Sequence, residues 1–464
     1  MHLTADRVRA FAIRQAFYRA ASLLPHLPDS LVLTIARSNL DRVVHPRGRL
    51  FMERLLLLSK QVLPRLSTNV RRKFLANFFG GLWVGAKNSD EFLAREGFEP
   101  PDFIVISPTM RCNLKCYGCY SGEYKKKDRL DSATLDRIIT EAKELGIYFI
   151  VLTGGEIFIR HDILDLLEKH DDVYFQCYTN GTRLDEGTVG RIAELGNLLP
   201  CISVEGFEKE TDERRGKGTW KAIMTAMDRL REAGCLFGFS ATATRLNTEL
   251  IISDEFIDFM VSKGCFLGWY FTYIPTGRGP ELELMQTPQQ RNLMWREVNR
   301  LRMEKDIVLA DFWNDGEFTG GCIAGGRVYL HINADGNVEP CVFTPFAADN
   351  IFEKSLVEVL KSDFFVRFRK NQAAVTNPLR PCMIIDHPHF LREAVFSSHA
   401  RPSYPGAEAM LTDLAPGLDD YSKRYAELAD KIWERYLQSG NYDWMQPEGE
   451  EKDEDKLRRA QGQV

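Results

Sequence analysis

Residues 111–120 read RCNLKCYGCY, which places Cys112, Cys116 and Cys119 in a C-x3-C-x2-C array. Three thiolates at this spacing can ligate three irons of a [4Fe–4S] cube, so that one iron is left without a protein ligand. An iron–sulfur cluster with an open iron is a reaction site, whereas a fully ligated cluster usually carries electrons only. This array therefore decides most of what the sequence predicts.

The residues around the array predict strands that alternate with helices. An apolar run at 104–107 (IVIS) precedes the cysteines, and a polar amphipathic stretch at 131–145 follows them, with Asp131 or Ser132 as N-cap. Residues 148–156 (YFIVLTGGE) then form an apolar strand that ends in two glycines and an acid. Structural cysteines or a zinc knuckle are the alternative, but zinc sites normally supply four ligands in paired units, and no fourth Cys or His lies near in the sequence.

These features resemble the radical S-adenosylmethionine (SAM) superfamily, whose motif is C-x3-C-x-Φ-C followed, one βα unit later, by a GGE-like strand end. The resemblance implies that the amino and carboxylate groups of SAM chelate the open iron. It also implies that an electron from the cluster cleaves SAM to a 5′-deoxyadenosyl radical, which abstracts a substrate hydrogen. The chain departs from the motif at the Φ position, usually aromatic or His, where it has Gly118, with Tyr117 and Tyr120 on either side.

Strand-like runs continue to alternate with amphipathic stretches up to residue 312. Repeated βα units with apolar strands predict a parallel sheet that binds its ligands at the C-terminal strand ends. Six or seven strands match the partial (β/α)6 radical SAM barrel, an α/β fold, better than a closed eight-stranded barrel. The further strand-like runs are 173–179, 199–206, 236–244, 266–274 and 307–312.

Several of these strands end in bare backbone or polar side chains. The resemblance assigns the GGE end to the methionyl ammonium of SAM and the end of the fourth strand to its ribose hydroxyls. An Arg after the fifth strand could pair with a carboxylate. The predicted cofactor-binding residues are Gly154, Gly155, Glu156, Ser203, Glu205, Thr242 and Arg245. A Ser or Thr at a strand end is more often a cap or turn residue, and no catalytic residue is identified.

A second cysteine pattern lies in residues 320–341 (GGCIAGGRVYLHINADGNVEPC). Cys322 and Cys341 flank a predicted hairpin with Gly336 at its turn. The pattern resembles the start of the SPASM or twitch extension of many radical SAM enzymes, which binds auxiliary [4Fe–4S] clusters. Because only Cys382 follows, the resemblance implies one auxiliary cluster, held by these three cysteines. Two buried thiols are the alternative for the pair at the hairpin.

The fourth iron of such a cluster is open to substrate or is ligated by another residue, for which Asp386, His387 and His389 are candidates. A polar loop is the alternative role for the histidines. The remaining cysteines lie in or beside apolar runs without partners at ligand spacing, so we expect them in the core. They are Cys177, Cys201, Cys235 and Cys265.

The charge of the chain is distributed unevenly. The 464 residues carry a net charge of −5, but residues 1–80 contain fourteen Lys or Arg and four Asp or Glu, a net charge of +10, which leaves −15 for the rest. This asymmetry suggests that the N-terminal part meets something anionic. Ten cysteines in a long chain without a signal peptide do not indicate a secreted disulfide framework. We therefore expect a cytoplasmic protein.

The stretches 7–24, 50–63 and 70–85 combine apolar faces with basic residues and predict helices. One interpretation is an interfacial layer in peripheral contact with an anionic membrane. The others are a helical domain on the barrel mouth and ordinary helices docked on the barrel. No 18-residue uncharged apolar run indicates a transmembrane span, and no motif indicates nucleic-acid binding.

These patterns divide the chain into a basic helical region (1–97), a radical SAM core (98–312), a SPASM/twitch-like domain (313–400), a helical segment (401–445) and a disordered charged tail (446–464). We expect an enzyme that acts on an unactivated C–H bond of a small-molecule or lipid substrate, with an electron donor of the flavodoxin or ferredoxin type. The alternatives are a peptide- or cofactor-maturing enzyme and an iron–sulfur electron-transfer or sensor protein. The GGE strand end argues against the last alternative.

Overall fold

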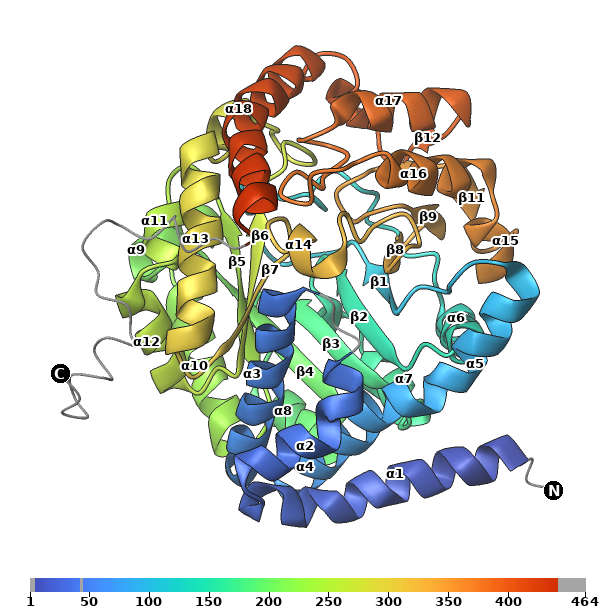
Figure 1. Ribbon diagram of the computed structural model, residues 1–464, viewed down its shortest axis with the longest axis vertical. Coiled ribbons are helices and arrows are strands. Elements are labelled where there is room, and N and C mark those ends of the chain that lie inside the picture. The colour runs from blue at the N-terminus through green and yellow to red at the C-terminus, as the bar shows by residue number, and fades with distance from the viewer. Residues whose placement is uncertain (1–4, 42–44, 441–464) are drawn as a thin grey trace.

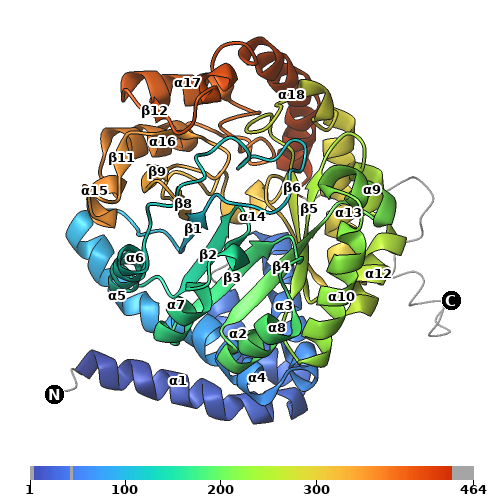
Figure 2. The same cartoon turned by 180° about the vertical axis from the view of Figure 1, so that it is seen from behind.

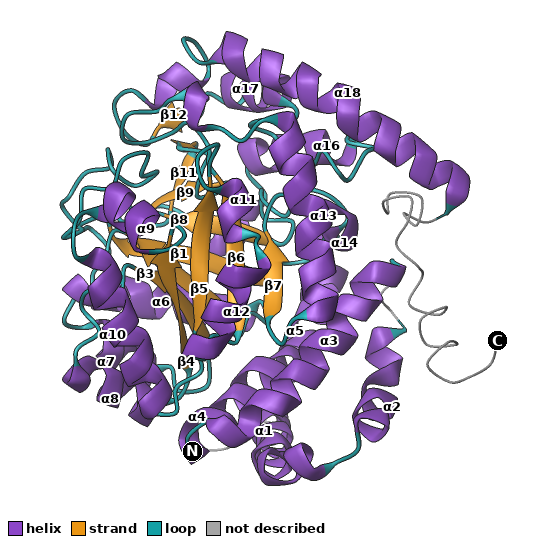
Figure 3. Cartoon of the chain, turned by 90° about the vertical axis from the view of Figure 1, so that its left-hand side faces the viewer, coloured by secondary structure: helices purple, strands orange, loops and turns teal. Residues whose placement is uncertain are grey.

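The computed structural model describes residues 5–41 and 45–440, so the predicted tail at 446–464 lies outside the described residues. Its centre is a ten-stranded sheet in the order β11-β9-β8-β1-β2-β3-β4-β5-β6-β7, surrounded by helices (Figures 1 and 3). The strands are β1 (Phe103–Thr109), β2 (Phe149–Gly154), β3 (Tyr174–Thr179), β4 (Leu198–Val204), β5 (Gly238–Ala243), β6 (Leu267–Thr272), β7 (Val308–Asp311), β8 (Tyr329–Ile332), β9 (Asn337–Glu339) and β11 (Asp349–Asn350).

Strands β1 to β7 are parallel and follow the chain order, which confirms the predicted partial barrel. Each predicted strand run between 104 and 312 overlaps one of them. Asp131 is the N-cap of the first crossover helix, where its carboxylate accepts from the backbone N–H of Thr134 at 2.8 Å. The helices between these strands are α6 (Ser132–Glu144), α7 (Ile163–Lys169), α8 (Glu186–Leu195), α9 (Glu208–Arg215), α10 (Thr219–Glu232), α11 (Thr248–Ile251), α12 (Asp254–Lys263) and α13 (Pro288–Glu304).

The predicted hairpin is β8 and β9, and it extends the barrel sheet because β8 pairs in parallel with β1. Gly336 has φ +81° at its turn, a left-handed conformation that favours glycine. A small antiparallel pair joins β10 (Phe346–Ala347) to β12 (Arg401–Pro402). The helices of this region are α14 (Gly316–Thr319), α15 (Leu356–Leu360), α16 (Asp363–Ala373), α17 (Pro388–Ser397) and α18 (Ala415–Ser439).

The N-terminal helices cover the end of the barrel where its strands begin. Phe74 packs against Tyr174 at the start of β3 and Phe266 just before β6. In Figure 1 these blue helices lie below the sheet, while the orange and red C-terminal region lies above it. The prediction of a domain on the barrel mouth is therefore wrong. The helices are α1 (Ala5–Leu23), α2 (Asp29–Leu40), α3 (Pro46–Val62), α4 (Thr68–Lys73), the π-helix η3 (Phe74–Phe79) and α5 (Gly80–Glu96).

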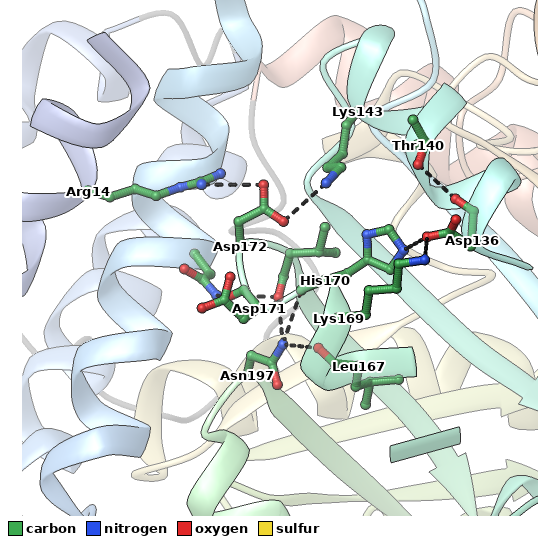
Figure 4. A network of polar contacts seen from close by, with 12 residues as sticks. Arg14, Asp136, Thr140, Lys143, Leu167, Lys169, His170, Asp171, Asp172 and Asn197 are labelled. Atoms are coloured by element: carbon green, nitrogen blue, oxygen red, sulfur yellow. Dashed lines mark hydrogen bonds and ion pairs between the residues drawn. The ribbon is translucent and has the colours of Figure 1, made fainter. Parts of the chain in front are cut away.

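Ion pairs join this basic layer to acidic residues of the barrel. Asp172 lies between Arg14 of α1, at 3.4 Å, and Lys143 of α6, at 3.2 Å (Figure 4). Lys73 pairs with Asp171 at 2.9 Å. The charge asymmetry predicted an anionic partner for the basic N-terminal region. Carboxylates of the barrel are part of that partner. Within the described residues, no helix is both long and apolar enough to cross a membrane.

Candidate active site

The cysteine loop, residues 110–123, leaves β1 at the C-terminal end of the parallel strands. It carries Cys112, Cys116 and Cys119, whose thiols are free and line one cavity in the barrel. In Figure 2 the segment after β1 crosses the sheet at the end that faces the C-terminal region. The loop thus brings the predicted ligands of the first cluster to the barrel mouth.

Gly118 in this loop has φ +61°, and a Cβ atom there would lie 2.7 Å from the ring of Tyr273. Tyr273 follows β6, is 2% exposed and lines the same cavity. The Tyr273 ring therefore occupies the space that a side chain at position 118 would need. This accounts for glycine at the Φ position.

Two arginines bind carbonyls of the cysteine loop, and a third acts electrostatically on one of its thiols. Arg214 of α9 donates to the carbonyl of Tyr117 at 3.4 Å and to that of Gly118 at 3.5 Å, and Arg278 donates to the carbonyl of Cys116 at 3.1 Å. Burial raises the pKa of Cys116, whereas Arg215, the third of these basic groups, favours its thiolate. These arginines were missed in the sequence, although the RR pair shortly after a predicted strand end was a signal.

Gly154 and Gly155 bring the end of β2 against the cysteine loop. A Cβ atom on Gly155 would overlap the carbonyl oxygen of Arg111, and Gly154 has φ +114°. The Tyr120 hydroxyl lies 2.8 Å from Thr153 Oγ1 and accepts from the Gly154 N–H at 3.2 Å. The two predicted halves of the cofactor site are therefore joined directly.

Glu156 is fully buried, and its carboxylate organises the neighbouring strand end. It accepts from the hydroxyl of Thr179 at 2.8 Å and from the backbone N–H of Asn180 at 2.8 Å. Burial raises the pKa of Glu156, and these hydrogen bonds oppose the shift. Its side chain thus binds the end of β3 next to the site. Its role toward SAM stays a prediction.

The other predicted cofactor residues differ in position. Ser203 and Thr242 line the cavity, the first 3.3 Å from the hydroxyl of Ser240. Glu205 does not line it, because its carboxylate pairs with Arg214 at 2.6 Å and with Arg215. Arg245 is exposed and donates to the carbonyl of Met285 at 3.1 Å, so the structure does not bring it to the cavity.

The cavity has a volume of 210 Å³ and runs from the cysteine loop into the barrel. Its interior wall is largely aromatic. Among the described residues that line it, only Arg214 and Arg215 belong to the permanently charged types. The aromatic lining residues include Tyr120, Tyr178, Trp269, Phe271, Phe312, Tyr329 and Phe343.

Cys322, Cys341 and Cys382 form the second group of thiols. The hairpin β8–β9 separates the first two, and the third returns from the segment before α17. Both Cys341 and Cys382 lie close enough to Cys322 for its thiolate to raise their pKa values, although burial is the larger cause. Tyr329 and Phe343, which contact Cys341, also line the barrel cavity.

The surroundings of both cysteine groups fit iron–sulfur ligation. A cube takes one cysteine per iron, and backbone N–H donors to the sulfurs stabilise the ligating thiolates. Such a donor recurs two residues after a cysteine in both groups. The pairs are Leu114 with Cys112 (3.4 Å), Phe343 with Cys341 (3.5 Å) and Ile384 with Cys382 (3.3 Å).

Two of the three candidates for a fourth ligand have other partners, and the third is exposed. Asp386 forms a buried pair with Arg291 at 2.5 Å and accepts from the Cys382 N–H at 2.9 Å. The Nε2 atom of His387 lies 2.9 Å from the carbonyl of Arg380, and His389 is exposed. Asp386 therefore positions the third cysteine. The core prediction for Cys177, Cys201, Cys235 and Cys265 is confirmed by their burial.

Two protein families match this chain. The first is described as the radical SAM superfamily and covers residues 106–244. The second is SPASM, an iron-sulfur cluster-binding domain, and covers residues 322–383. Both cysteine groups fall inside the matched ranges.

Two relatives each match more than half of the chain. It is 28% identical over 302 residues to the mycofactocin maturase MftC of Mycolicibacterium smegmatis, across 60% of this chain and 75% of the relative. It is 25% identical over 288 residues to an AdoMet-dependent heme synthase of Methanosarcina barkeri, across 56% and 82%. The crystal structure of Streptococcus suis SuiB bound to S-adenosylmethionine has a TM-score of 0.51 at 21% identity, across 60% and 70%, which shows a shared fold.

Proposed function

The chain is a radical SAM superfamily enzyme with a C-terminal SPASM iron–sulfur domain, and we propose that it modifies an unactivated C–H bond in the precursor of a cofactor or peptide. When bound, the radical SAM cluster and SAM supply a 5′-deoxyadenosyl radical that abstracts a substrate hydrogen. The substrate class and the residue roles given below are proposals.

In this proposal, Cys112, Cys116 and Cys119 hold the radical SAM cluster. The bare backbone of Gly154 and Gly155 leaves room beside them for the methionyl end of SAM, and Ser203 and Thr242 line the cavity further along. Arg214 and Arg278 bind the loop carbonyls and fix the shape of the loop, while Glu205 pairs with Arg214 and with the neighbouring Arg215. A flavodoxin- or ferredoxin-like protein serves as electron donor.

Cys322, Cys341 and Cys382 hold one auxiliary [4Fe–4S] cluster in this account. The support is their chemistry: they are free and largely buried thiols, and two of them accept backbone N–H donors. Asp386 fixes the third cysteine through its backbone N–H.

The cavity carries the proposal. Its lining includes the three loop cysteines, the glycine strand end, and Tyr329 and Phe343, which contact Cys341. A substrate group in this space would lie beside the first proposed cluster and next to two aromatic residues that contact Cys341. Because the interior is aromatic and apolar, the reacting group that enters should be uncharged.

The comparisons support precursor maturation better than our main expectation of a lipid substrate. The two relatives are named as a maturase and a heme synthase, which are not lipid enzymes. The N-terminal layer, on which the lipid expectation depended, lies at the far end of the barrel and pairs with its carboxylates. Contact with an anionic membrane stays a prediction.

Deuterium transfer tests the proposal. The anaerobically reconstituted enzyme is incubated with SAM, a reductant and one deuterated candidate substrate. The candidate substrates are peptides with one apolar residue, porphyrin precursors and anionic lipid vesicles. We expect deuterium in 5′-deoxyadenosine with a peptide or porphyrin. Phe271→Asp should reduce this transfer at least about tenfold by placing a charge in the cavity, while Leu246→Ala, at an exposed position, should not. Transfer from lipid alone would refute the substrate class.

A further inference from the structure

Tyr329 lies at the start of β8, between the two hairpin cysteines in sequence. Its ring stacks on Phe103 at 5.3 Å with an interplanar angle of 2° and contacts Phe312 edge-on at 5.7 Å. Its backbone N–H donates to the carbonyl of Ile323 and its carbonyl accepts from the N–H of Gly326. The ring is thus packed between two aromatic contacts and held at its backbone, which restricts the direction of its hydroxyl.

The Tyr329 hydroxyl donates to Cys341 Sγ at 2.9 Å. The tyrosine is completely buried, so water does not compete for this bond. Cys341 therefore has two donors, the phenol and the N–H of Phe343 at 3.5 Å.

A hydrogen bond to a ligating sulfur changes the reduction potential of an iron–sulfur cluster. The reduced cluster carries one more negative charge than the oxidised cluster, so a donor stabilises the reduced form more. A buried donor has a larger effect than an exposed one because the local dielectric constant is low. Because Tyr329 donates to the sulfur, a cluster held by Cys341 should have a higher reduction potential with this hydrogen bond than without it.

We propose that Tyr329 is a positioning residue that raises the reduction potential of the auxiliary cluster through its hydrogen bond to Cys341. This proposal rests on the proposed ligation of that cluster by Cys341. The ring of Tyr329 also lines the barrel cavity. A substrate in the cavity would therefore contact the residue that sets the potential of the cluster. Packing alone is the competing role, and it predicts no dependence on the hydroxyl.

Tyr329→Phe keeps the ring and removes only the donor. We would measure the potential of the auxiliary cluster by a spectroscopically monitored redox titration in the Cys112→Ala/Cys116→Ala/Cys119→Ala background, where it is the remaining cluster. The matched control is Tyr178→Phe, because Tyr178 lines the same cavity but its hydroxyl accepts from Gln176 Nε2 at 3.0 Å. Activity is not needed for this readout.

We expect Tyr329→Phe to lower the ratio of reduced to oxidised cluster about tenfold at a fixed potential, a shift of about 59 mV for a one-electron couple. Tyr178→Phe should leave the ratio unchanged. An unchanged potential in a Tyr329→Phe protein that retains its iron would overturn the proposal. An equal shift in both variants would do the same.

A second substitution covers the case in which Tyr329→Phe loses its iron. Site-specific 3,5-difluorotyrosine at position 329 keeps the ring and makes the hydroxyl a stronger donor, so the potential should move in the opposite direction, upward. No upward shift would overturn the proposal. If the parent background itself binds no iron, the auxiliary cluster is absent, and the proposed function fails at that point together with this inference.

Discussion

Single glycines decide how closely the strand end of β2 approaches the cysteine loop. Gly154 adopts a left-handed conformation, and Gly155 leaves no room for a Cβ atom beside the Arg111 carbonyl. Arg111 directly precedes Cys112. A side chain at position 155 would therefore move the first cluster ligand as well as the cofactor site.

We predict that Gly155→Ala lowers both iron content and SAM affinity, because the new methyl group displaces the Arg111 carbonyl. Iron analysis of the reconstituted variant and equilibrium dialysis with SAM would show a joint loss. Gly190→Ala is the control, since a Cβ atom there contacts nothing within 4 Å. If the variant keeps its full iron content but loses SAM binding, Gly155 affects only the SAM site and not the cysteine loop.

Glu205 illustrates a residue whose predicted role and observed partners differ. Its buried carboxylate pairs with Arg214 and Arg215. We predict that Glu205→Gln lowers the free energy of unfolding by about 3 kcal/mol, because removal of one partner leaves buried charge uncompensated. Chemical denaturation measures this change. If stability is unchanged while SAM affinity falls, Glu205 contacts the ribose instead, as the resemblance implied.

The hairpin β8–β9 is held to the radical SAM core by a chain of buried side chains. Ser107 of β1 lies 2.7 Å from His331 Nε2, and His331 Nδ1 lies 2.7 Å from Glu339. Tyr124, just after the cysteine loop, donates to the same carboxylate at 3.0 Å. The hydrogen bonds around Glu339 thus connect β1, the cysteine loop and the hairpin. These three parts carry or flank both cysteine groups.

We predict that Tyr124→Phe lowers the free energy of unfolding by about 1.5–3 kcal/mol, the usual range for a hydrogen bond to a charged group. The ring remains, so the effect isolates the hydroxyl and Glu339. Denaturant titration of the purified protein measures it. A change below about 0.5 kcal/mol would show that the hairpin does not depend on this link.

At the level of the whole molecule, the N-terminal layer closes the barrel opposite its mouth. Burial raises the pKa of Asp172, but Lys143 and Arg14 outweigh it and hold the pKa below its usual range. The stabilisation from this carboxylate is therefore present above the ordinary Asp pKa, about 4. It is lost as the pH falls through the lower folded-state value.

We accordingly predict that Asp172→Asn is less stable than the parent at pH 7 and that the difference shrinks as the pH falls below about 4. Denaturation at a series of pH values measures this difference. Thr225→Ala, on the exposed side of α10, is a control that should show no such dependence. A difference that persists unchanged at low pH would assign the effect to packing.

Periodicity and strand-end patterns predicted the parallel strands and the N-cap at Asp131 because both depend on local sequence. The cysteine arrays were also visible, because their spacing is short or bounded by a hairpin. The packing of Tyr273 on Gly118 was not predictable, since it joins distant segments, whereas the nearby arginine partners of Glu205 were missed although they follow it by only nine and ten residues. The location of the N-terminal layer was missed because apolar and basic faces suit a membrane and an acidic barrel equally well.

The central proposal is two separate iron–sulfur sites, the first with its cysteines in the cavity lining and the second beside Tyr329 and Phe343 of that lining. The most direct test is the iron content of the Cys112→Ala/Cys116→Ala/Cys119→Ala variant after anaerobic reconstitution, measured with its Mössbauer spectrum. The account predicts about eight irons per chain in the parent and about four in this variant, all in one [4Fe–4S] environment. A variant with no bound iron would contradict it, because residues 322–383 would then hold no cluster of their own.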